Sequence, residues 1–97
     1  MTFEWDEDKN RANMRKHGLD FADADEMFRG VLVVDPETDE DYGERRWTGI
    51  GTIRGRTAHV VFTDRGPETI RIISLRKATR REVEQYEKAI QDRLEAC

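Results

Sequence analysis

The stretch from Thr69 to Ile90, TIRIISLRKATRREVEQYEKAI, joins the last predicted strand of the chain to its last predicted helix. Its first seven residues are rich in β-branched side chains, which is typical of a strand. Thr79, followed three residues later by Glu82, forms a capping box and predicts that a helix begins there. That helix then presents an apolar face formed by Val83, Tyr86, Ala89, Ile90 and Leu94.

Strand alternation predicts the face on which each side chain of TIRIISL lies. It places Arg71 with Ile73 and Leu75, on the face opposite to Ile70 and Ile72. One face of the sheet must pack against helices, so we expect Arg71 on the other face. A guanidinium in that position requires an anion or a carboxylate.

The residues before this stretch have a β pattern. VLVVD (31–35) reads as a strand, PETDEDYG (36–43) as an acidic loop, and DRGPE (64–68) as a tight turn. ERRWTGIGTI (44–53) and RTAHVVFT (56–63) form a predicted hairpin around Arg54-Gly55. These segments predict an antiparallel sheet of about four strands, as short turns join consecutive antiparallel strands.

Two helices are predicted near the N-terminus, after a short first strand, TFEW (2–5). Asp6 caps a helix through residues 7–17 that Gly18 ends, and Asp20 caps a second helix that Gly30 ends. The second helix has an inward stripe of Phe21, Ala24, Met27 and Phe28. The predicted fold class is α+β, with two N-terminal helices, the sheet and a C-terminal helix in a single domain over residues 1–97.

The formal net charge of −4 hides an asymmetry along the chain. Residues 1–44 carry 14 acidic and 5 basic side chains, whereas residues 45–81 carry two acidic and ten basic ones. Such an asymmetry favours a polyanionic partner for the basic part. The alternative is that the two halves neutralise each other across the fold.

The basic residues concentrate where the last strand meets the last helix: Arg71, Arg76, Lys77, Arg80 and Arg81. Bases in the first turn of a helix oppose its dipole, unless an anion binds there. Phosphate suits several arginines at once. The competing interpretation is that Glu82, Glu84 and acids of the N-terminal half neutralise these bases.

Other chemistry-bearing residues are few. His17 is read as a dipole partner at a helix end, and His59 as a packed or rim side chain of a strand more often than a catalyst. No metal ligand set and no phosphate-cradling glycine loop is found, so no metal and no cofactor are predicted. A single cysteine, Cys97, and the lack of a signal peptide or membrane-spanning run predict a cytoplasmic protein.

Two long segments resemble the BrnT family of toxins. The first, FEWDEDKNRANMRKHGLDFADADEMF, has the E-W-D start, the K-x-x-x-N helix (Lys9 and Asn13) and the K-H-G stop of that family. The second, residues 44–87, has its V-V-F-T-D-R-G turn and its R-I-I-S-x-R-K-A ending. The similarity covers about residues 3–87.

The resemblance implies a type II toxin with a RelE-like fold that cleaves RNA, and because no metal ligand set is found, we predict that cleavage needs no metal ion. It also implies neutralisation by a ribbon-helix-helix antitoxin, with operator DNA bound only through that complex. On this basis we predict phosphate and transition-state contacts from Arg71 and Arg76, and proton transfer by Tyr86, Lys77 or His59. The predicted contacts to the RNA backbone are Arg45, Arg46, Arg56, Arg80 and Arg81. A non-enzymatic toxin and a module that only docks a partner remain the alternatives.

Overall fold

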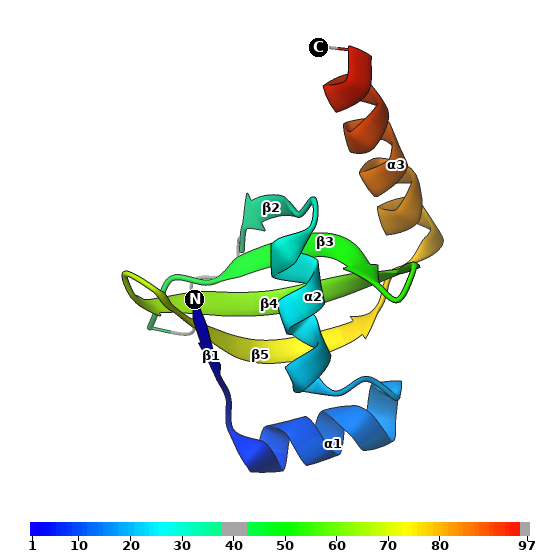
Figure 1. The fold of residues 1–97 in the computed structure, drawn as a ribbon. Coiled ribbons are helices and arrows are strands. Elements are labelled where there is room, and N and C mark those ends of the chain that lie inside the picture. Colours follow the sequence, from blue (N-terminus) through cyan, green and yellow to red (C-terminus); the bar gives the residue numbers. More distant parts are fainter. Residues whose placement is uncertain (38–42, 96–97) are drawn as a thin grey trace.

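A computed structural model describes residues 1–37 and 43–95, and Figure 1 shows its architecture. The helical elements are α1 (Glu7–His17), a 3₁₀ turn (Phe21–Asp23), α2 (Ala24–Arg29) and α3 (Arg80–Glu95). The strands are β1 (Thr2–Glu4), β2 (Val33–Pro36), β3 (Trp47–Ile53), β4 (Arg56–Gly66) and β5 (Thr69–Lys77). Most of the predicted acidic loop and Cys97 lie outside the described residues.

The strands form one sheet in the order β1-β5-β4-β3-β2. The predicted antiparallel meander is confirmed, because β2, β3, β4 and β5 pair antiparallel in sequence order. The prediction of an antiparallel sheet of about four strands is wrong in one respect: β1 adds a fifth strand, parallel to β5. A three-residue strand that pairs 67 positions away leaves no local turn signal, so its partner is not readable from sequence.

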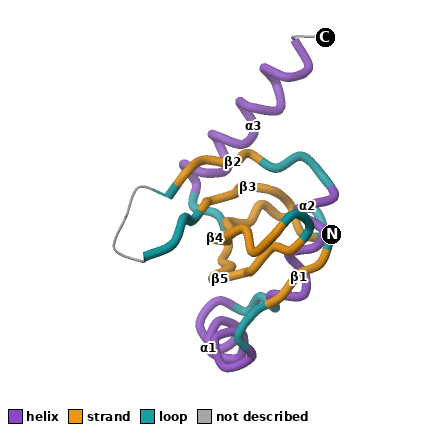
Figure 2. The backbone as a smooth tube through the Cα atoms, turned by 90° about the vertical axis from the view of Figure 1, so that its left-hand side faces the viewer, coloured by secondary structure: helices purple, strands orange, loops and turns teal. Residues whose placement is uncertain are grey.

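Helices α1 and α2 cover one face of the sheet. The first turns of α3 pack against the other face. Figure 1 shows α2 crossing the sheet, and Figure 2 shows α3 running away from the body on the side opposite to α1. Gly49 and Gly51 of β3 let Leu32 approach closely, since a Cβ on either would lie within 3.2 Å of its Cδ1 atom. The core lies between the sheet and the first two helices: Phe21, Ala24, Met27, Ile53, Ala58, Val60, Phe62, Ile70, Ile72 and Leu75.

A β-bulge in β5 changes the predicted facing of its side chains. Val61 pairs with Ser74 and Phe62 with Ile72, so Ile73 is the extra residue. Beyond the bulge the alternation is reversed, and Leu75 is fully buried in the core instead of sharing the face of Arg71. Arg76 therefore emerges on the face opposite to the core.

Two buried asparagines of α1 hold this end of β5 in place. The Asn13 amide donates to the carbonyls of Leu75 (2.7 Å) and Leu19 (3.1 Å), and its oxygen accepts the Leu75 N–H (3.2 Å). Asn10 donates to Asp20 and accepts the N–H of Phe21. Since β1 pairs only with Thr69–Arg71, Asn13 takes the place of a neighbouring strand at the exposed edge near Leu75.

No helix within residues 1–37 or 43–95 combines the length and the apolar character needed to cross a bilayer.

Candidate functional site

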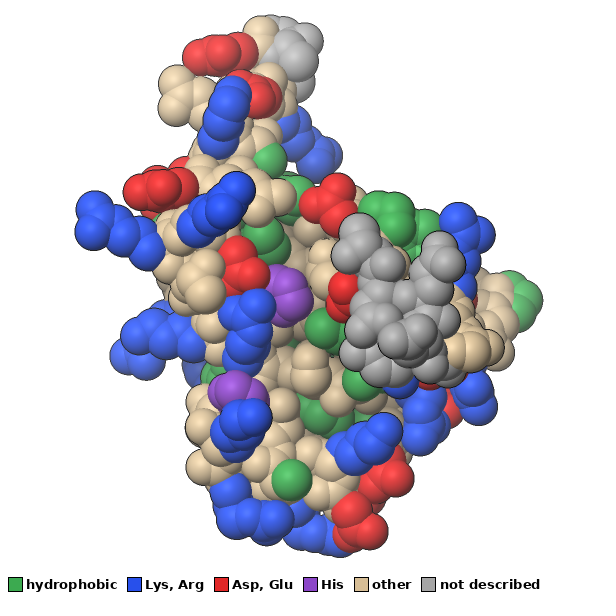
Figure 3. Space-filling view, turned by 180° about the vertical axis from the view of Figure 1, so that it is seen from behind, with side chains coloured by type: hydrophobic (Ala, Val, Ile, Leu, Met, Phe, Trp, Pro, Cys, Tyr) green, Lys and Arg blue, Asp and Glu red, His purple; other side chains and the backbone are tan. Residues whose placement is uncertain are grey.

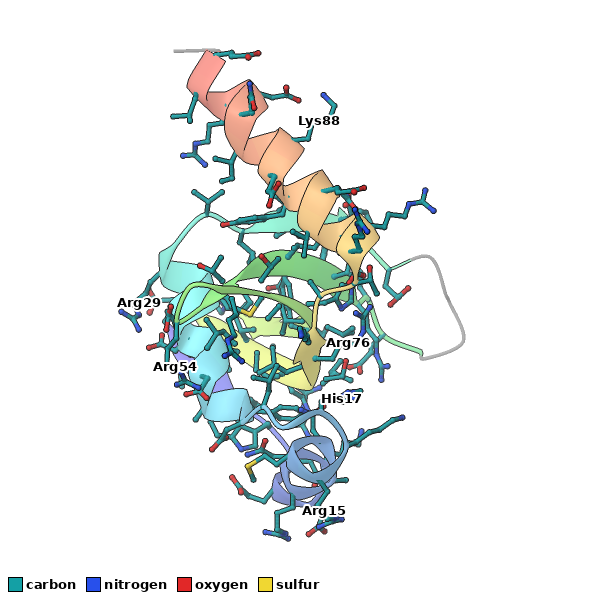
Figure 4. All side chains as sticks on the ribbon, turned by 90° about the vertical axis from the view of Figure 1, so that its right-hand side faces the viewer. Arg15, His17, Arg29, Arg54, Arg76 and Lys88 are labelled. Carbon is teal, nitrogen blue, oxygen red and sulfur yellow. The ribbon has the colours of Figure 1, made fainter. Side chains whose placement is uncertain are left out.

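The junction of β5 and α3 is built by the predicted capping box. The Glu82 N–H donates to the Thr79 hydroxyl (3.2 Å), and the Thr79 N–H donates to the Glu82 carboxylate (2.8 Å). This reciprocal pair fixes the first turn of α3 and turns the carboxylate back toward the sheet. Figure 4, with α3 at the top, shows Arg76 beneath that first turn.

Arg76 and Glu82 form a bidentate ion pair. Nη1 and Nη2 of Arg76 donate to the two carboxylate oxygens at 2.8 and 2.9 Å, and Nη1 also donates to the Lys77 carbonyl. The hydrogen bonds from Arg76, with a smaller effect of the Thr79 N–H, lower the pKa of Glu82 to about 2. The same pairing raises the pKa of Arg76. Both groups therefore stay charged across the physiological range.

His59 completes this cluster from the neighbouring strand. It pairs in register with Arg76, and its Nε2 lies 3.6 Å from Glu82 Oε2. The imidazole is only 12% exposed, and burial, followed by the charge of Arg76, lowers its pKa. His59 is consequently neutral at pH 7, and its buried Nδ1 has no hydrogen-bond partner among the described residues. We call Arg76, His59 and Glu82 the junction cluster.

Arg71 does not join the junction cluster. It lies five positions earlier on β5, which is about 16 Å along a strand. Its Nη1 donates to Glu4 of β1 at 2.7 Å. Glu4 is also 3.9 Å from Arg65, so the N-terminal acid neutralises this basic end of the sheet.

The other proton-transfer candidates also lie outside the cluster. The Tyr86 hydroxyl donates to the Val31 carbonyl at 3.0 Å, which anchors α3 beside β2. Lys77 follows Arg76 but points to the opposite side of the sheet, where it lines a cavity with Arg56. Figure 3 shows the molecule from the side away from α2, where each of the two histidines has Lys or Arg side chains beside it.

The predicted RNA-backbone contacts are scattered over the surface. Arg80 is 94% exposed beside Glu84 (3.7 Å), and Arg81 is exposed with no ion pair to any described residue. Arg45 stacks over the Trp47 ring at 5.0 Å, and Arg46 is largely buried beside Glu44 (3.4 Å). The neutralisation hypothesis is thus confirmed for Arg71, Arg76 and Arg80, each of which has a carboxylate partner.

Sequence reasoning treated Glu82 as a cap and a neutralising charge and missed its place between Arg76 and His59. A signal was present: a capping-box glutamate faces back over the residue before the helix, and Arg76 lies six positions earlier. The link to His59 depends on the register of β4 and β5, which two irregularities between the turn and His59 shift. Within the described part of the chain, no group of three or more His, Cys, Asp or Glu side chains is arranged to hold a metal ion.

Comparisons with known proteins agree with this architecture. The chain matches, over residues 5–82, the family described as "Ribonuclease toxin, BrnT, of type II toxin-antitoxin system". Its structure resembles the 1.1 Å crystal structure of the Brucella abortus ribonuclease toxin BrnT, with a TM-score of 0.67 and 38% sequence identity. That match covers 82% of this chain and 99% of the Brucella chain. A comparison with curated proteins finds no match.

The predicted kinship with RelE-like ribonucleases stays a prediction, since the structural match is to BrnT. The resemblance stated from the sequence motifs is confirmed by both findings: the chain belongs to the BrnT family of ribonuclease toxins of type II toxin–antitoxin systems.

Proposed function

We propose that this toxin cleaves RNA at the junction cluster without a metal ion, by attack of a 2′-hydroxyl on the adjacent phosphate. The observation that supports this most strongly is the convergence of a guanidinium, a neutral imidazole and a carboxylate at the end of β5. Such a set supplies charge stabilisation and proton transfer from side chains alone.

Arg76 is the proposed phosphate contact. A guanidinium has five N–H donors, and Glu82 and the Lys77 carbonyl together engage three of them. The Nε–H and one Nη2–H remain, and they lie on the same edge of the guanidinium. That edge matches two phosphoryl oxygens, and Glu82 holds it in a fixed orientation before the substrate arrives.

His59 is the proposed proton acceptor. Its Nδ1 is buried, so Nε2, which lies 3.6 Å from Glu82, takes the proton of the 2′-hydroxyl, and the carboxylate stabilises the imidazolium that forms. The 2′-oxygen then bonds to phosphorus, and the bond to the 5′-oxygen breaks to leave a 2′,3′-cyclic phosphate. The proton held by His59 passes to the departing 5′-oxygen. Tyr86 and Lys77 are less suited, because the Tyr86 proton is engaged by Val31 and Lys77 lies on the other side of the sheet.

The test is cleavage of a defined RNA in the presence of excess chelator. Wild-type protein should cleave, whereas Arg76→Ala and His59→Ala should each lose at least about 10²-fold in rate. Arg29→Ala is the matched control, since Arg29 is an exposed arginine of α2 paired with Asp25. Cleavage that requires a divalent ion, or that survives in both cluster variants, would refute the proposed site.

The partner of a type II toxin is an antitoxin, and we propose that it packs against α3. This helix runs away from the body of the protein (Figure 2) and carries Tyr86, Ile90 and Leu94 along one side, of which Tyr86 lies nearest the body. Leu94 is 71% exposed, and Val34 of the adjacent β2 is also exposed. An exposed apolar stripe of this kind is expected to be covered by a partner.

The proposed antitoxin is a ribbon-helix-helix protein that carries the toxin to operator DNA, as the family resemblance implies. Leu94→Ser should weaken co-purification with the antitoxin while leaving RNA cleavage unchanged. The acidic N-terminal half is the alternative covered surface, and Met14→Ser on α1 tests it, since Met14 is exposed. If Met14→Ser weakens co-purification with the antitoxin and Leu94→Ser does not, the antitoxin binds α1 and not α3.

A further inference from the structure

A second basic site lies beside the junction cluster, and the cleavage mechanism proposed above does not use it. It is a cavity of about 530 Å³ between the end of α1 and the β3–β4 hairpin. His17 comes from α1, Arg54 and Arg56 from the hairpin, and Lys77 from the end of β5. This volume falls within the range of small-molecule sites, roughly 300–1,000 Å³.

The charged residues that line this cavity are all basic. None of its lining residues is acidic, and neither Arg56 nor Lys77 has an ion pair with any described residue. Arg54 is the exception, because its guanidinium lies 3.4 Å from Asp23. In contrast to the paired arginines of the junction cluster and of β1–β5, these cations present a positive potential that an anion would neutralise.

The floor of the cavity is apolar. Leu19, Ile53 and Ala58 line it, and Ile53 and Ala58 are buried in the core. An apolar wall next to a few cationic groups suits a ligand with a flat ring and a phosphate, which is the chemistry of a nucleotide. A free anion would need no such wall.

The turn that carries Arg54 is held in an uncommon conformation. Arg54 has φ 49° and is followed by Gly55 at φ 79°, as in a two-residue hairpin turn that usually begins with Asn or Asp. Its N–H donates to Glu26 of α2 at 2.8 Å, which fixes the turn against the helix. Non-glycine residues held in the left-handed region cluster at functional sites.

Strand pairing connects this cavity to the junction cluster. His59 pairs with Arg76, and the next pair along the strands is Ala58 with Lys77. The two sites are therefore one residue apart, on opposite sides of the sheet end. Figure 4 shows Arg76 and His17 on the same side of the molecule, so one strand of RNA can pass from one site to the other around that end.

We propose that this cavity binds a nucleotide of the RNA next to the one that is cleaved. Arg56 and Lys77 hold its phosphate, and the base lies against Leu19 and Ile53. The inference rests on the proposed function, since it names a subsite for the same RNA.

The test is binding of a fluorescent 2′-O-methyl RNA hexamer, which has no free 2′-hydroxyl to attack, measured by anisotropy against salt concentration. Arg56→Gln/Lys77→Gln should bind at least about 10-fold more weakly. Its salt slope should fall by about 0.7 for each phosphate that the variant no longer neutralises. The control Lys9→Gln/Arg29→Gln removes the same charge from exposed positions of α1 and α2 and should change neither quantity. Equal affinity of the cavity variant and the control would overturn the inference.

A second measurement separates a nucleotide from a simple anion. Uridine monophosphate should shift the NMR amide signals of Leu19 and Thr57 in the wild type and not in the cavity variant. If inorganic phosphate shifts both signals equally well, the cavity is an anion site and the nucleotide assignment is wrong. If the wild type cleaves RNA but the cavity variant binds RNA as tightly as the wild type, this inference is wrong and the proposed function stands. If RNA binds in the cavity but the wild type does not cleave it, the proposed function is wrong and the cavity remains a nucleotide site.

Discussion

The ion pair between Arg76 and Glu82 should stabilise the folded protein measurably at neutral pH. The perturbation is Glu82→Gln, which removes the charge and keeps an oxygen for the Thr79 N–H. Glutamine is also a natural capping-box residue, so the first turn of α3 should persist. The change therefore isolates the charge that lies between Arg76 and His59.

The magnitude follows from the pKa of Glu82. Folding lowers it from 4.5 to about 2. At about 1.4 kcal/mol per pKa unit this difference sets a ceiling of about 3 kcal/mol. Because the carboxylate keeps some contact with solvent, about 2 kcal/mol is the expected loss of stability at pH 7. The folded-state pKa lies below the unfolded one, so this contribution is complete above about pH 4.5 and disappears as the pH falls toward 2.

Urea denaturation of both proteins between pH 7 and pH 3 measures this difference. The two curves should be separated at pH 7 and should converge as the pH falls below about 4.5. Glu84→Gln is the control near the same helix end, where the exposed partner Arg80 should make the effect smaller than about 0.5 kcal/mol. A Glu82→Gln effect as small as that of the control, or one independent of pH, would refute the reasoning.

Three further predictions follow from named contacts. Asn13→Ala should destabilise the protein by about 2–4 kcal/mol in urea titrations, because the N–H and carbonyl of Leu75 lose their partner in a buried setting. The rate of RNA cleavage should fall on acidification with a midpoint below 6.5, since the pKa of His59 is lowered, and Glu82→Gln should move that midpoint lower because the carboxylate charge raises this pKa. Arg54→Asn should raise thermal stability by about 0.5–1 kcal/mol, since Asn tolerates a left-handed conformation better, while RNA affinity falls in the same anisotropy assay.

The local features of the fold were predictable from the sequence, because each rests on residues close together. The capping box at Thr79, the Asp6 cap, the Gly18 stop and the hairpin around Arg54-Gly55 are all confirmed. They depend on contacts between side chain and backbone over two to four positions, which residue identity largely decides.

The features that escaped prediction depend on contacts far apart in the chain. The bulge at Ile73 has no mark in TIRIISL, yet it reverses the facing of Leu75 and Arg76. Asn13 reads as an ordinary polar helix residue until β5 is placed beside it, 62 positions later. The candidate site combines both kinds of contact. Arg76 and Glu82 are six positions apart in the sequence, whereas His59 lies beside them only because β4 pairs with β5.

Charge neutralisation and phosphate binding looked like competing explanations for the basic junction, and the geometry makes them compatible. Glu82 neutralises Arg76 on one edge of the guanidinium and thereby orients the other edge. Arg76→Lys separates the two ideas, because a lysine keeps the charge and cannot offer two fixed N–H groups on a free edge. If the orientation of that edge matters, cleavage should fall by about 10²–10³-fold, the usual effect of removing a transition-state donor. If only local charge matters, the lysine variant should cleave RNA nearly as fast as the wild type, and the Arg76–Glu82 pair would then have no orienting role in cleavage.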